Sequence, residues 1–434
     1  MRPTRFARRN AELAIALKLP RVVTTRGRLA LAAGAGARWA SRMTGRGAGA
    51  MIGGLVAMTL DRSILRQLGV GRRAVVVTGT NGKSTTTRMT AAALRTIGPV
   101  ATNAEGANMD AGLVAALAAD RAAGLAVLEV DEMHVPHVAD AVEPAVIVLL
   151  NLSRDQLDRV GEINVIERRL RAGLAAHPHT VVVANCDDVL MTSAAYDHAD
   201  VVWVAAGGSW AADSVSCPRS GEVIVREHGH WYSTGADFKR PSPQWWFDDE
   251  TLYGPDGLTL PMRLALPGTV NRGNAAQAVA AAVAVGADPA AAVAAVSGVD
   301  EVAGRYRTIR VGQHDVRMLL AKNPAGWQEA LSMVDKDAAG VVIAVNGRVP
   351  DGEDLSWLWD VRFEEFEMHF HGIPVVAAGE RGTDLAVRLG YADVKHTLVH
   401  DTVAAIASCP PGPVEVVANY TAFLQLQRRL ARNG

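Results

Sequence analysis

The stretch Val75-Val-Val-Thr-Gly-Thr-Asn-Gly-Lys-Ser-Thr-Thr-Thr87 decides the fold of this 434-residue chain. A run of β-branched residues leads into two glycines, and a helical pattern begins directly after them. Gly79 and Gly82 allow a tight turn that brings backbone N–H groups close to an anion. The N-terminus of the following helix also favours negative charge. The stretch therefore predicts a phosphate-binding turn between a buried strand and a helix.

The residues after the second glycine supply the chemistry expected of an ATP site. Lys83 can reach the outer phosphates, and the Ser84 hydroxyl can bind Mg²⁺. We therefore expect ATP and Mg²⁺ as the cofactors of this chain. The expected nucleotide-binding residues of the loop are Gly79, Thr80, Asn81, Gly82, Lys83, Ser84 and Thr85.

Composition narrows the class of protein. The chain is 49% hydrophobic and 21% charged, so it can bury substantial cores, and its length predicts two or three domains. Its formal net charge of −1 gives no support for nucleic-acid binding. Cys186, Cys217 and Cys409 are too far apart to suggest a disulfide framework or a complete metal site, which fits a reducing compartment.

The N-terminal region has the pattern of neither a signal peptide nor a membrane span. The basic residues up to Arg9 are not followed by a long apolar core, and the apolar stretch 48–60 is too short to cross a bilayer. We therefore expect a cytoplasmic protein without a transmembrane segment. The basic N-terminus leaves open a peripheral contact with the inner face of the cell membrane.

Strand and helix patterns alternate from about residue 73 onward, which predicts an α/β fold with a largely parallel sheet. Residues 207–259 interrupt the alternation with Gly, Ser, Pro and Trp, and we expect a small β-rich insert there. A second alternating unit of ordinary domain size follows Gly304. We expect an N-terminal segment at 1–60, a central ATP-binding domain at 61–300 and a C-terminal domain at 301–434.

This alternation also predicts individual strands. The expected strands of the central domain are 74–77, 126–130, 145–150 and 181–184, and those of the C-terminal domain are 316–320, 341–345, 375–378 and 414–418. Helices are expected near 325–333, 381–389 and 421–430 in the C-terminal domain.

Acidic residues follow one of the expected strands. Glu129 lies at the end of the strand, where the carboxyl ends of parallel strands face the ligand crevice, and we expect it to bind Mg²⁺ together with Ser84. Asp131 and Glu132 are alternatives for this role, and any of these acids could instead cap the next helix. The histidines at 134 and 137 are more typical of solvated or capping side chains than of a metal pair.

Several blocks of the chain resemble the Mur ligase and folylpolyglutamate synthetase superfamily. In that superfamily two residues separate the glycines of the phosphate loop, as here, and polar groups such as those of Asn151, Asp155 and Asp158 follow a later strand. The blocks Arg154-Asp-Gln-Leu-Asp-Arg159 and Asp351-Gly-Glu-Asp-Leu-Ser-Trp357 resemble the MurT branch. The similarity extends from about residue 50 to the C-terminus.

The resemblance implies a fold and an activity. The implied fold is α/β, a Mur ligase-like P-loop ATP-binding domain with a small β-rich insert, followed by a C-terminal Rossmann-like α/β domain. The implied enzyme is an ATP-dependent ligase that amidates the α-carboxylate of D-glutamate in the lipid II stem peptide to D-isoglutamine, via an acyl phosphate. Its ammonia would come from a GatD-type glutamine amidotransferase subunit in a heterodimer, and lipid II would be the lipid-linked substrate.

The resemblance also assigns nucleotide contacts outside the loop. Asn271 would contact the adenine, because a side-chain amide can both donate to and accept from a purine edge. The alternative for Asn271 and Asn274 is N-capping of the helix that they open. Arg305 would meet the γ-phosphate.

Asp354 is the residue that the resemblance places at the partner's active site. Its carboxylate would complete a cysteine–histidine triad of the glutaminase by fixing the histidine tautomer. Asp351 and Asp360 are the alternatives for this role, and Asp354 could instead only cap a helix through Ser356 and Trp357.

The insert departs from the family pattern. Relatives usually carry a zinc ribbon with two Cys-Pro-x-Cys-Gly-like knuckles, whereas Cys217 is the only ligand retained here, with Ser220, Ser233 and Ala236 at the other positions. One thiolate cannot build a tetrahedral zinc site, so we expect no bound zinc. We expect packing to hold the insert instead, through Trp231, Tyr232, Trp245 and Trp246.

Two other functions compete with amidation. An amino-acid-adding Mur or folylpolyglutamate-type ligase would use an amino acid in place of ammonia, and the two MurT-like blocks count against it. A nucleotide-binding scaffold for a glutaminase would need no catalysis, and the intact Lys83, Ser84 and Glu129 count against it.

Overall fold

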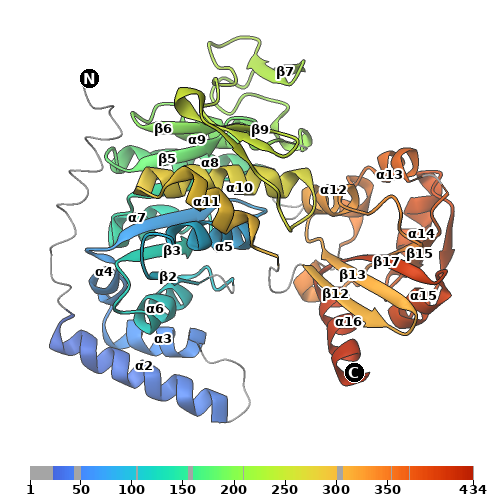
Figure 1. Cartoon of the computed structure of the whole chain (residues 1–434), viewed down its shortest axis with the longest axis horizontal. Coiled ribbons are helices and arrows are strands. Elements are labelled where there is room, and N and C mark those ends of the chain that lie inside the picture. Colours follow the sequence, from blue (N-terminus) through green and yellow to red (C-terminus); the bar gives the residue numbers. More distant parts are fainter. Residues whose placement is uncertain are drawn as a thin grey trace. The chain divides into compact units, whose positions relative to one another are not determined.

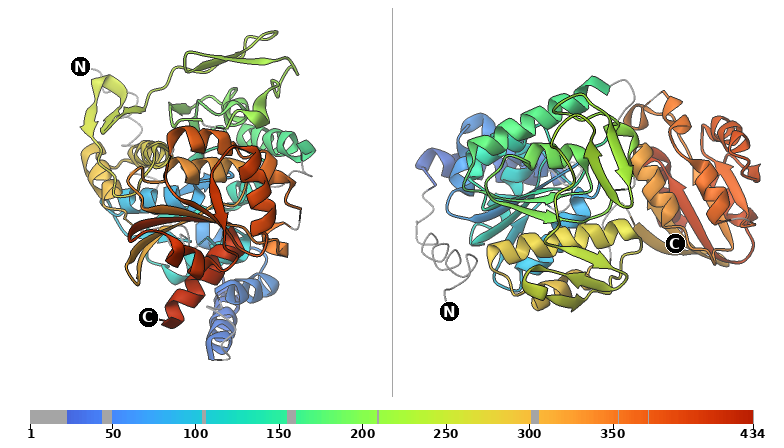
Figure 2. Two further views of the ribbon diagram at one scale, coloured as in Figure 1. Left: turned by 90° about the vertical axis from the view of Figure 1, so that its right-hand side faces the viewer. Right: turned by 90° about the horizontal axis from the view of Figure 1, so that it is seen from above.

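The computed structural model describes residues 23–43, 50–103, 106–154, 160–208, 210–300, 306–352, 354–370 and 372–433. The chain divides into two compact units, one of residues up to 152 with 162–300, the other of residues 301–434 with 153–161 (Figures 1 and 2). Each unit is built around its own six-stranded sheet.

The six strands of the first unit are parallel and lie in the order β2-β3-β1-β4-β5-β6. Strands β1, β3, β4 and β5 are rich in valine, leucine and isoleucine and almost wholly buried, as expected when both faces of a parallel sheet are covered. This sheet confirms the expected α/β architecture. The strands are β1 (Arg73–Thr78), β2 (Val100–Thr102), β3 (Leu125–Glu129), β4 (Val146–Leu149), β5 (Val181–Asn185) and β6 (Val201–Val204).

Helices cover both faces of this sheet, with α8 and α10 on opposite sides in the right-hand view of Figure 2. Helix α10 packs against α5, and its Gln277 amide donates to the Leu149 carbonyl at 2.9 Å, which fixes the helix at the end of β4. The helices are α5 (Lys83–Leu94), α6 (Asp110–Ala119), α7 (Val135–Val142), α8 (Val160–Ala176), α9 (Val189–Ala195), α10 (Thr269–Val285) and α11 (Pro289–Ser297).

Three further helices precede the sheet: α2 (Thr25–Met43), α3 (Ala50–Leu60) and α4 (Ile64–Gly69). Helices α2 and α3 pack on each other, and α3 packs on α6 (Figure 1). The apolar stretch at the end of the N-terminal segment is thus a short helix on the side of the first unit. Within the described ranges, no helix has both the length and the hydropathy that a membrane span requires.

The insert is β-rich, as expected, and has a small core of its own. Cys217, Ile224, Trp231 and Phe238 are buried there against Val189 of α9. Its elements are the 3₁₀ helix η3 (Ala212–Ser214), the hairpin β7 (Ile224–Glu227) and β8 (His230–Ser233), the antiparallel sheet of β9 (Trp246–Asp248), β10 (Thr251–Tyr253) and β11 (Thr259–Pro261), and the 3₁₀ helix η4 (Pro255–Gly257).

The expected packing of the insert is half right. Trp231 and Trp245 are buried, which confirms their role. Tyr232 and Trp246 are each 41% exposed, so the prediction was wrong for them. Alternation along β8 turns Trp231 inward and therefore turns Tyr232 outward. Trp246 stacks instead on the ring of Tyr253, with the two ring centroids 5.3 Å apart.

The second unit has a mixed sheet in the order β12-β13-β17-β14-β15-β16, in which only the edge strand β12 is antiparallel to its neighbour. Its four inner strands and the three expected helices confirm the prediction for this domain. The sequence pattern did not predict β12 and β16, because β12 carries polar residues among its apolar ones and β16 has only three residues.

The strands of this unit are β12 (Tyr306–Val311), β13 (His314–Leu320), β14 (Gly340–Ala344), β15 (Val375–Ala378), β16 (His396–Leu398) and β17 (Gly412–Ala418). Its α-helices are α12 (Pro324–Ser332), α13 (Phe363–His369), α14 (Gly382–Tyr391), α15 (Thr402–Ser408) and α16 (Tyr420–Asn433). Two 3₁₀ helices, η5 (Val349–Asp351) and η6 (Ser356–Trp359), follow β14.

Candidate nucleotide-binding site

Two glycines give the loop after β1 its shape. Gly79 has φ of 145° and Gly82 has φ of 82°, and both angles lie in the region that only glycine adopts readily. A Cβ atom on Gly79 would lie 2.7 Å from the Leu150 Cβ, and one on Gly82 would lie 2.7 Å from the Asn274 Oδ1. The loop can therefore follow its path only with glycine at both positions.

Asn151, at the end of β4, clamps this loop. Its carbonyl accepts from the Thr80 N–H at 2.9 Å, its Oδ1 accepts from the Asn81 N–H at 2.9 Å, and its Nδ2 donates to the Asn81 carbonyl at 3.1 Å. The sequence shows that the polar group of Asn151 follows a later strand, but it does not indicate the partner of this side chain. The structure shows that it fixes the backbone of the phosphate loop.

Lys83 is held at the base of the loop. Its ammonium donates to the carbonyls of Gly79 and Thr80, and it forms an ion pair with the Glu132 Oε1 at 3.3 Å. Both side chains of this pair are only 11% exposed. Glu132 is thus the counter-ion of the lysine, whereas the sequence left it open as an alternative metal ligand.

Glu129 ends β3 beside the loop, because β3 pairs with β1 residue for residue from Arg73 to Val77. The side-chain amide of Asn103 fixes its backbone: Asn103 Oδ1 accepts from the Glu129 N–H, and Asn103 Nδ2 donates to the Glu129 carbonyl, both at 2.8 Å. Glu129 is 3% exposed and Ser84, in the first turn of α5, is 8% exposed. The structure therefore brings both expected metal ligands to the same edge of the sheet.

The other acid and the two histidines near this edge have local partners. Asp131 Oδ1 accepts from the Met133 N–H at 3.1 Å. His137 Nε2 lies 3.1 Å from one carboxylate oxygen of Asp110, and His134 Nδ1 lies 3.8 Å from the other. No group of three or more His, Cys, Asp or Glu side chains among the described residues is arranged to hold a metal ion. Mg²⁺ commonly uses only one or two protein ligands beside substrate phosphates, so Ser84 and Glu129 suffice for it.

The start of α10 faces the same loop. Asn271 and Asn274 are buried, and Asn274 Nδ2 donates to Asn271 Oδ1 at 3.4 Å. The capping alternative is wrong for both, because the N-cap residue of α10 is Gly268. Asn271 Nδ2 donates instead to the Pro267 carbonyl at 2.6 Å.

The Asn185-Cys-Asp-Asp188 block is structural. Asp188 caps α9 by accepting from the Met191 N–H at 2.8 Å, and it also accepts from the Leu152 N–H at 3.1 Å. Burial raises the pKa of Asp188 to about 6, although these backbone hydrogen bonds act in the opposite direction. Asp187 pairs with Arg240 at 2.6 Å and so ties the insert to β5.

Three of the expected residues lie outside the described ranges: Arg305, Asp155 and Asp158. The structure therefore does not test the expected contact of Arg305 with the γ-phosphate.

Asp354, in the second unit, has an exposed carboxylate. Its Oδ1 accepts from the Ser356 N–H at 2.8 Å and its Oδ2 accepts from the Ser356 Oγ at 3.0 Å. These two hydrogen bonds hold the pKa of Asp354 below its ordinary value, so the group is ionised at neutral pH. The neighbouring Trp357 anchors the segment, because its ring stacks on that of Trp327 with the centroids 5.5 Å apart.

Of the alternatives to Asp354, Asp351 is already engaged within the domain. Its carboxylate accepts from both the backbone N–H, at 2.8 Å, and the hydroxyl of Thr421. Asp360 is half-buried. Asp354 is therefore the most accessible of the three carboxylates.

Two family models match this chain. The Mur ligase middle domain matches residues 77–282, and the MurT ligase C-terminal domain matches residues 320–423. The first match contains the phosphate loop and the start of α10, and the second contains Asp351 and Asp354.

Curated relatives match along nearly the whole chain. The lipid II isoglutaminyl synthase (glutamine-hydrolyzing) subunit MurT of Streptococcus pneumoniae is 29% identical over 89% of this chain and 93% of its own length. The subunit of the same name from Staphylococcus aureus is 27% identical over 92% of this chain and 96% of its own length.

Solved structures share the fold. A pseudomurein peptide ligase type C from Methanothermus fervidus superposes with a TM-score of 0.65 at 18% identity and covers 86% of this chain and 81% of its own. MurF from Acinetobacter baumannii gives a TM-score of 0.62 at 18% identity and covers 86% and 80% of the two chains. The family models, the full-length relatives and the shared fold together show that this chain belongs to the MurT branch of the Mur ligase family.

Proposed function

We propose that this chain is the synthetase subunit of a lipid II isoglutaminyl synthase. It amidates the α-carboxylate of D-glutamate in the lipid II stem peptide to D-isoglutamine, with ATP activating the carboxylate as an acyl phosphate. The observation that carries the proposal is the match along nine-tenths of the chain to relatives of that name, together with a complete phosphate loop. The lipid-linked substrate brings the protein to the inner face of the cell membrane.

The phosphate loop supplies the ATP contacts. The loop from Gly79 to Ser84 binds the phosphates at the N-terminus of α5, through the backbone N–H groups that Asn151 does not occupy, and Lys83 neutralises their charge. Asn271 contacts the adenine from α10, and Arg305 meets the γ-phosphate. Asn274 at the start of α10 lies against Gly82 of the loop. This contact supports a nucleotide that extends from its phosphates on the loop to its adenine at α10.

Ser84 and Glu129 hold Mg²⁺ in this proposal. A hydroxyl and a carboxylate are hard oxygen ligands, and Asn103 fixes the backbone that carries the carboxylate. The ion, when bound, neutralises charge on the phosphate oxygens. Glu132 keeps Lys83 at the base of the loop until the phosphates arrive.

A GatD-type glutaminase supplies the ammonia. We assign the partner surface to the C-terminal domain, residues 301–434, while residues 61–300 form the ATP-binding domain and residues 1–60 precede it. Asp354 completes the partner's catalytic triad, and two features support this: its carboxylate is exposed, and Ser356 orients it.

The insert is a zinc ribbon that has lost three of its four ligands and keeps only Cys217. Ser220 Oγ and Ser233 Oγ lie 3.4 Å apart, and Ala236 packs on the same small core as Cys217. Burial raises the pKa of the Cys217 thiol, but hydrogen bonds with Ser220 and Ser233 outweigh that effect and leave it lowered. Cys217, Ser220 and Ser233, which occupy three of the four ligand positions, thus still lie close together. Elemental analysis of the purified protein tests the proposal, and zinc at about one per chain would refute it.

The experiment that tests the activity is amidation of lipid II, followed by mass spectrometry. The chain is supplied with ATP, Mg²⁺ and either ammonium or glutamine with the co-purified glutaminase. We expect the glutamate hydroxyl to be replaced by an amine, and Lys83→Ala to abolish this product. Lys336→Ala is the matched control, because Lys336 is exposed in the second unit.

The other outcomes separate the competing functions. A product that is heavier by an amino-acid residue would identify an amino-acid-adding ligase. ATP hydrolysis that lipid II does not stimulate, with no product from either nitrogen source, would indicate a scaffold.

A further inference from the structure

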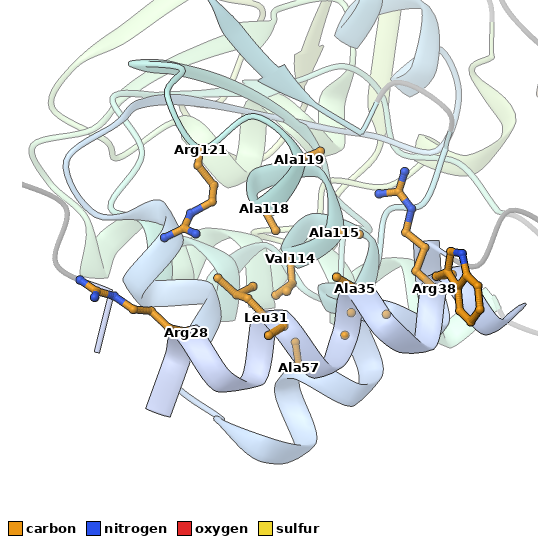
Figure 3. A pocket seen from close by; sticks show the side chains of 15 residues that line it. Arg28, Leu31, Ala35, Arg38, Ala57, Val114, Ala115, Ala118, Ala119 and Arg121 are labelled. Carbon is orange, nitrogen blue, oxygen red and sulfur yellow. The ribbon is translucent and has the colours of Figure 1, made fainter. Parts of the chain in front are cut away.

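Helices α2, α3 and α6 of the first unit enclose an open groove of about 510 Å³ (Figure 3). Its floor is apolar and consists mainly of alanine and glycine with Leu31 and Val114. Among the residues that the structure describes, the charged side chains that line it are all arginines, Arg28, Arg38 and Arg121. Figure 3 shows Arg28 and Arg121 at one end of the groove and Arg38 at the other, with the apolar side chains between them.

The two N-terminal helices α2 and α3 carry charged residues of only one sign. Helix α2 contains four arginines and no acidic residue, and α3 contains no charged residue at all. Of the charged side chains in the described part of the groove, a phosphate therefore meets only positive ones. Arginine suits such a ligand, because its planar guanidinium can donate two parallel hydrogen bonds to one phosphate.

The same two helices expose an unusual amount of apolar surface. Leu29 and Trp39 are each 67% exposed, and further large apolar side chains on α2 and α3 are at least 41% exposed: Met43, Met51, Ile52, Leu55 and Leu60. Apolar surface in this concentration marks a site that contacts another apolar molecule. The groove and this surface together suit a ligand that has both a phosphate and a hydrocarbon chain.

Helix α6 connects the groove to the nucleotide site. Its first residue lies three positions after Ala107, whose carbonyl accepts from the Asn103 amide that also fixes Glu129. The groove-lining residues Val114, Ala115, Ala118 and Ala119 lie further along the same helix. The ten residues of α6 rise about 15 Å. A sugar and one amino acid separate the phosphates of a lipid-linked muropeptide from its D-glutamate, which is a spacing of the same order.

We propose that the groove between α2, α3 and α6 binds the prenyl pyrophosphate of the lipid-linked substrate. The arginines bind the phosphates, and the apolar floor holds the first isoprene units. The exposed side chains of α2 and α3 continue the apolar path toward the bilayer. This inference rests on the proposed function for its ligand, but its residues are separate from the nucleotide site.

Vesicle binding tests the inference without catalysis. The full chain with its glutaminase is mixed with phosphatidylcholine vesicles that carry undecaprenyl pyrophosphate, or phosphatidylglycerol at the same charge density. We expect stronger binding to the prenyl lipid, and a loss of about a hundredfold in the double variant Arg28→Gln/Arg121→Gln, because each of the two charge-assisted contacts contributes about tenfold. The control Arg62→Gln/Arg95→Gln removes the same charge from exposed positions outside the groove.

A second pair of variants tests the apolar floor. Ala118→Trp fills the groove without a change of charge, whereas Ala33→Trp adds the same side chain at an exposed position of α2 that does not line it. We expect only the first to weaken binding to the prenyl lipid. Equal binding to phosphatidylglycerol, or equal effects of groove and control variants, would overturn the inference.

Kinetics separate this inference from the proposed function. With lipid II, the groove variants should raise KM and leave kcat unchanged, and with a soluble muropeptide that lacks the prenyl pyrophosphate they should change neither. Unchanged KM in an active enzyme refutes the groove alone. If the protein does not amidate lipid II but still binds the vesicles, and the groove variants weaken that binding, the proposed activity alone is refuted.

Discussion

At the scale of single residues, side-chain amides at the strand ends shape the nucleotide site. Asn151 binds the backbone of the loop at two successive residues, and Asn103 binds both backbone groups of Glu129. Neither residue needs to contact ATP to matter. They fix the positions of the groups that contact ATP. Hydrogen bonds of this kind, behind the binding groups, commonly set how well a site is preorganised.

Asn151→Ala should weaken ATP binding more than it weakens the fold. The substitution removes the partner of the Asn81 N–H, and an unsatisfied buried N–H costs about 1–3 kcal/mol. We expect KM for ATP to rise about tenfold. Asn151→Asp keeps the acceptor but loses the donor and adds a negative charge beside the phosphates, so its KM should rise at least as much. An unchanged KM in Asn151→Ala would show that this clamp is unimportant for ATP binding.

Asp188 should make stability depend on pH. Its pKa is raised by burial from 3.8 to about 6, so between these values the folded state holds a proton that the unfolded state has lost. Its contribution to the free energy of unfolding therefore falls as pH rises through this window, by about 3 kcal/mol at most, and is constant above it.

This contribution can be measured by urea unfolding of the wild type and of Asp188→Asn. The measurements should be made at several pH values, from the lower of the two pKa values up to neutrality. The stability of the wild type relative to the variant should decrease with rising pH. The absolute stability also changes, because an amide nitrogen cannot accept from a backbone N–H, so the slope is the informative quantity. A difference that is flat or rises with pH would mean that Asp188 has an ordinary pKa.

At the scale of elements, the helices beside the groove meet backbone to backbone. A Cβ atom on Gly54 would lie 1.9 Å from the Ala111 carbonyl oxygen, and Cβ atoms on Gly34 and Gly53 would lie 2.5 and 2.8 Å from each other's carbonyl oxygens. The three glycines therefore allow α3 to pack closely against both α2 and α6.

Gly54→Ala should destabilise the first unit by about 1–3 kcal/mol or more, because backbone must shift to admit the methyl group. Gly36→Ala, in the middle of α2 with nothing within 4 Å of its added Cβ, should instead stabilise by about 0.5–1 kcal/mol through a lower chain entropy. Thermal unfolding, with amide exchange of α3, measures both. Similar effects of the two substitutions would contradict the close packing.

The sequence could predict elements whose cause is local. The phosphate loop and the inner strands followed from short patterns of glycine, lysine and β-branched residues. The contacts of Asn151 with Asn81, which is 70 positions away, follow from the order of strands and not from any short pattern. The groove was missed for the same reason, because it exists only where α2, α3 and α6 come together. Tyr232 and Trp246 were placed in the core because a large ring alone does not show which face of a strand is buried.

At the scale of the whole molecule, the proposed reaction divides between two chains. ATP is bound by the first unit of this chain, ammonia is released in the partner, and Asp354 belongs to this chain's second unit. A single side chain of the ligase subunit would thus act in the active site of the glutaminase.

Asp354→Asn should abolish glutamine-dependent amidation, by about a thousandfold or more, because the amide cannot stabilise the histidine in its required form. Ammonium-dependent amidation should be unchanged, since the ATP site is untouched. Asp351→Asn is the comparison variant: it removes an acceptor of Thr421 and should lower stability and both activities together. Equal loss of both activities in Asp354→Asn would assign this residue a structural role only.

The glycines at the helix crossings have a consequence for how this chain can evolve. Positions 34, 53 and 54 touch neither ATP nor the partner in the proposed mechanism, yet the nearest atoms to any added side chain there are mainly backbone atoms. A survey of every single substitution would therefore find some of the least tolerant positions of the N-terminal helices at residues without a side chain. We therefore expect sequence changes in this region to accumulate away from the helix crossings, while the paths of the helix backbones stay the same.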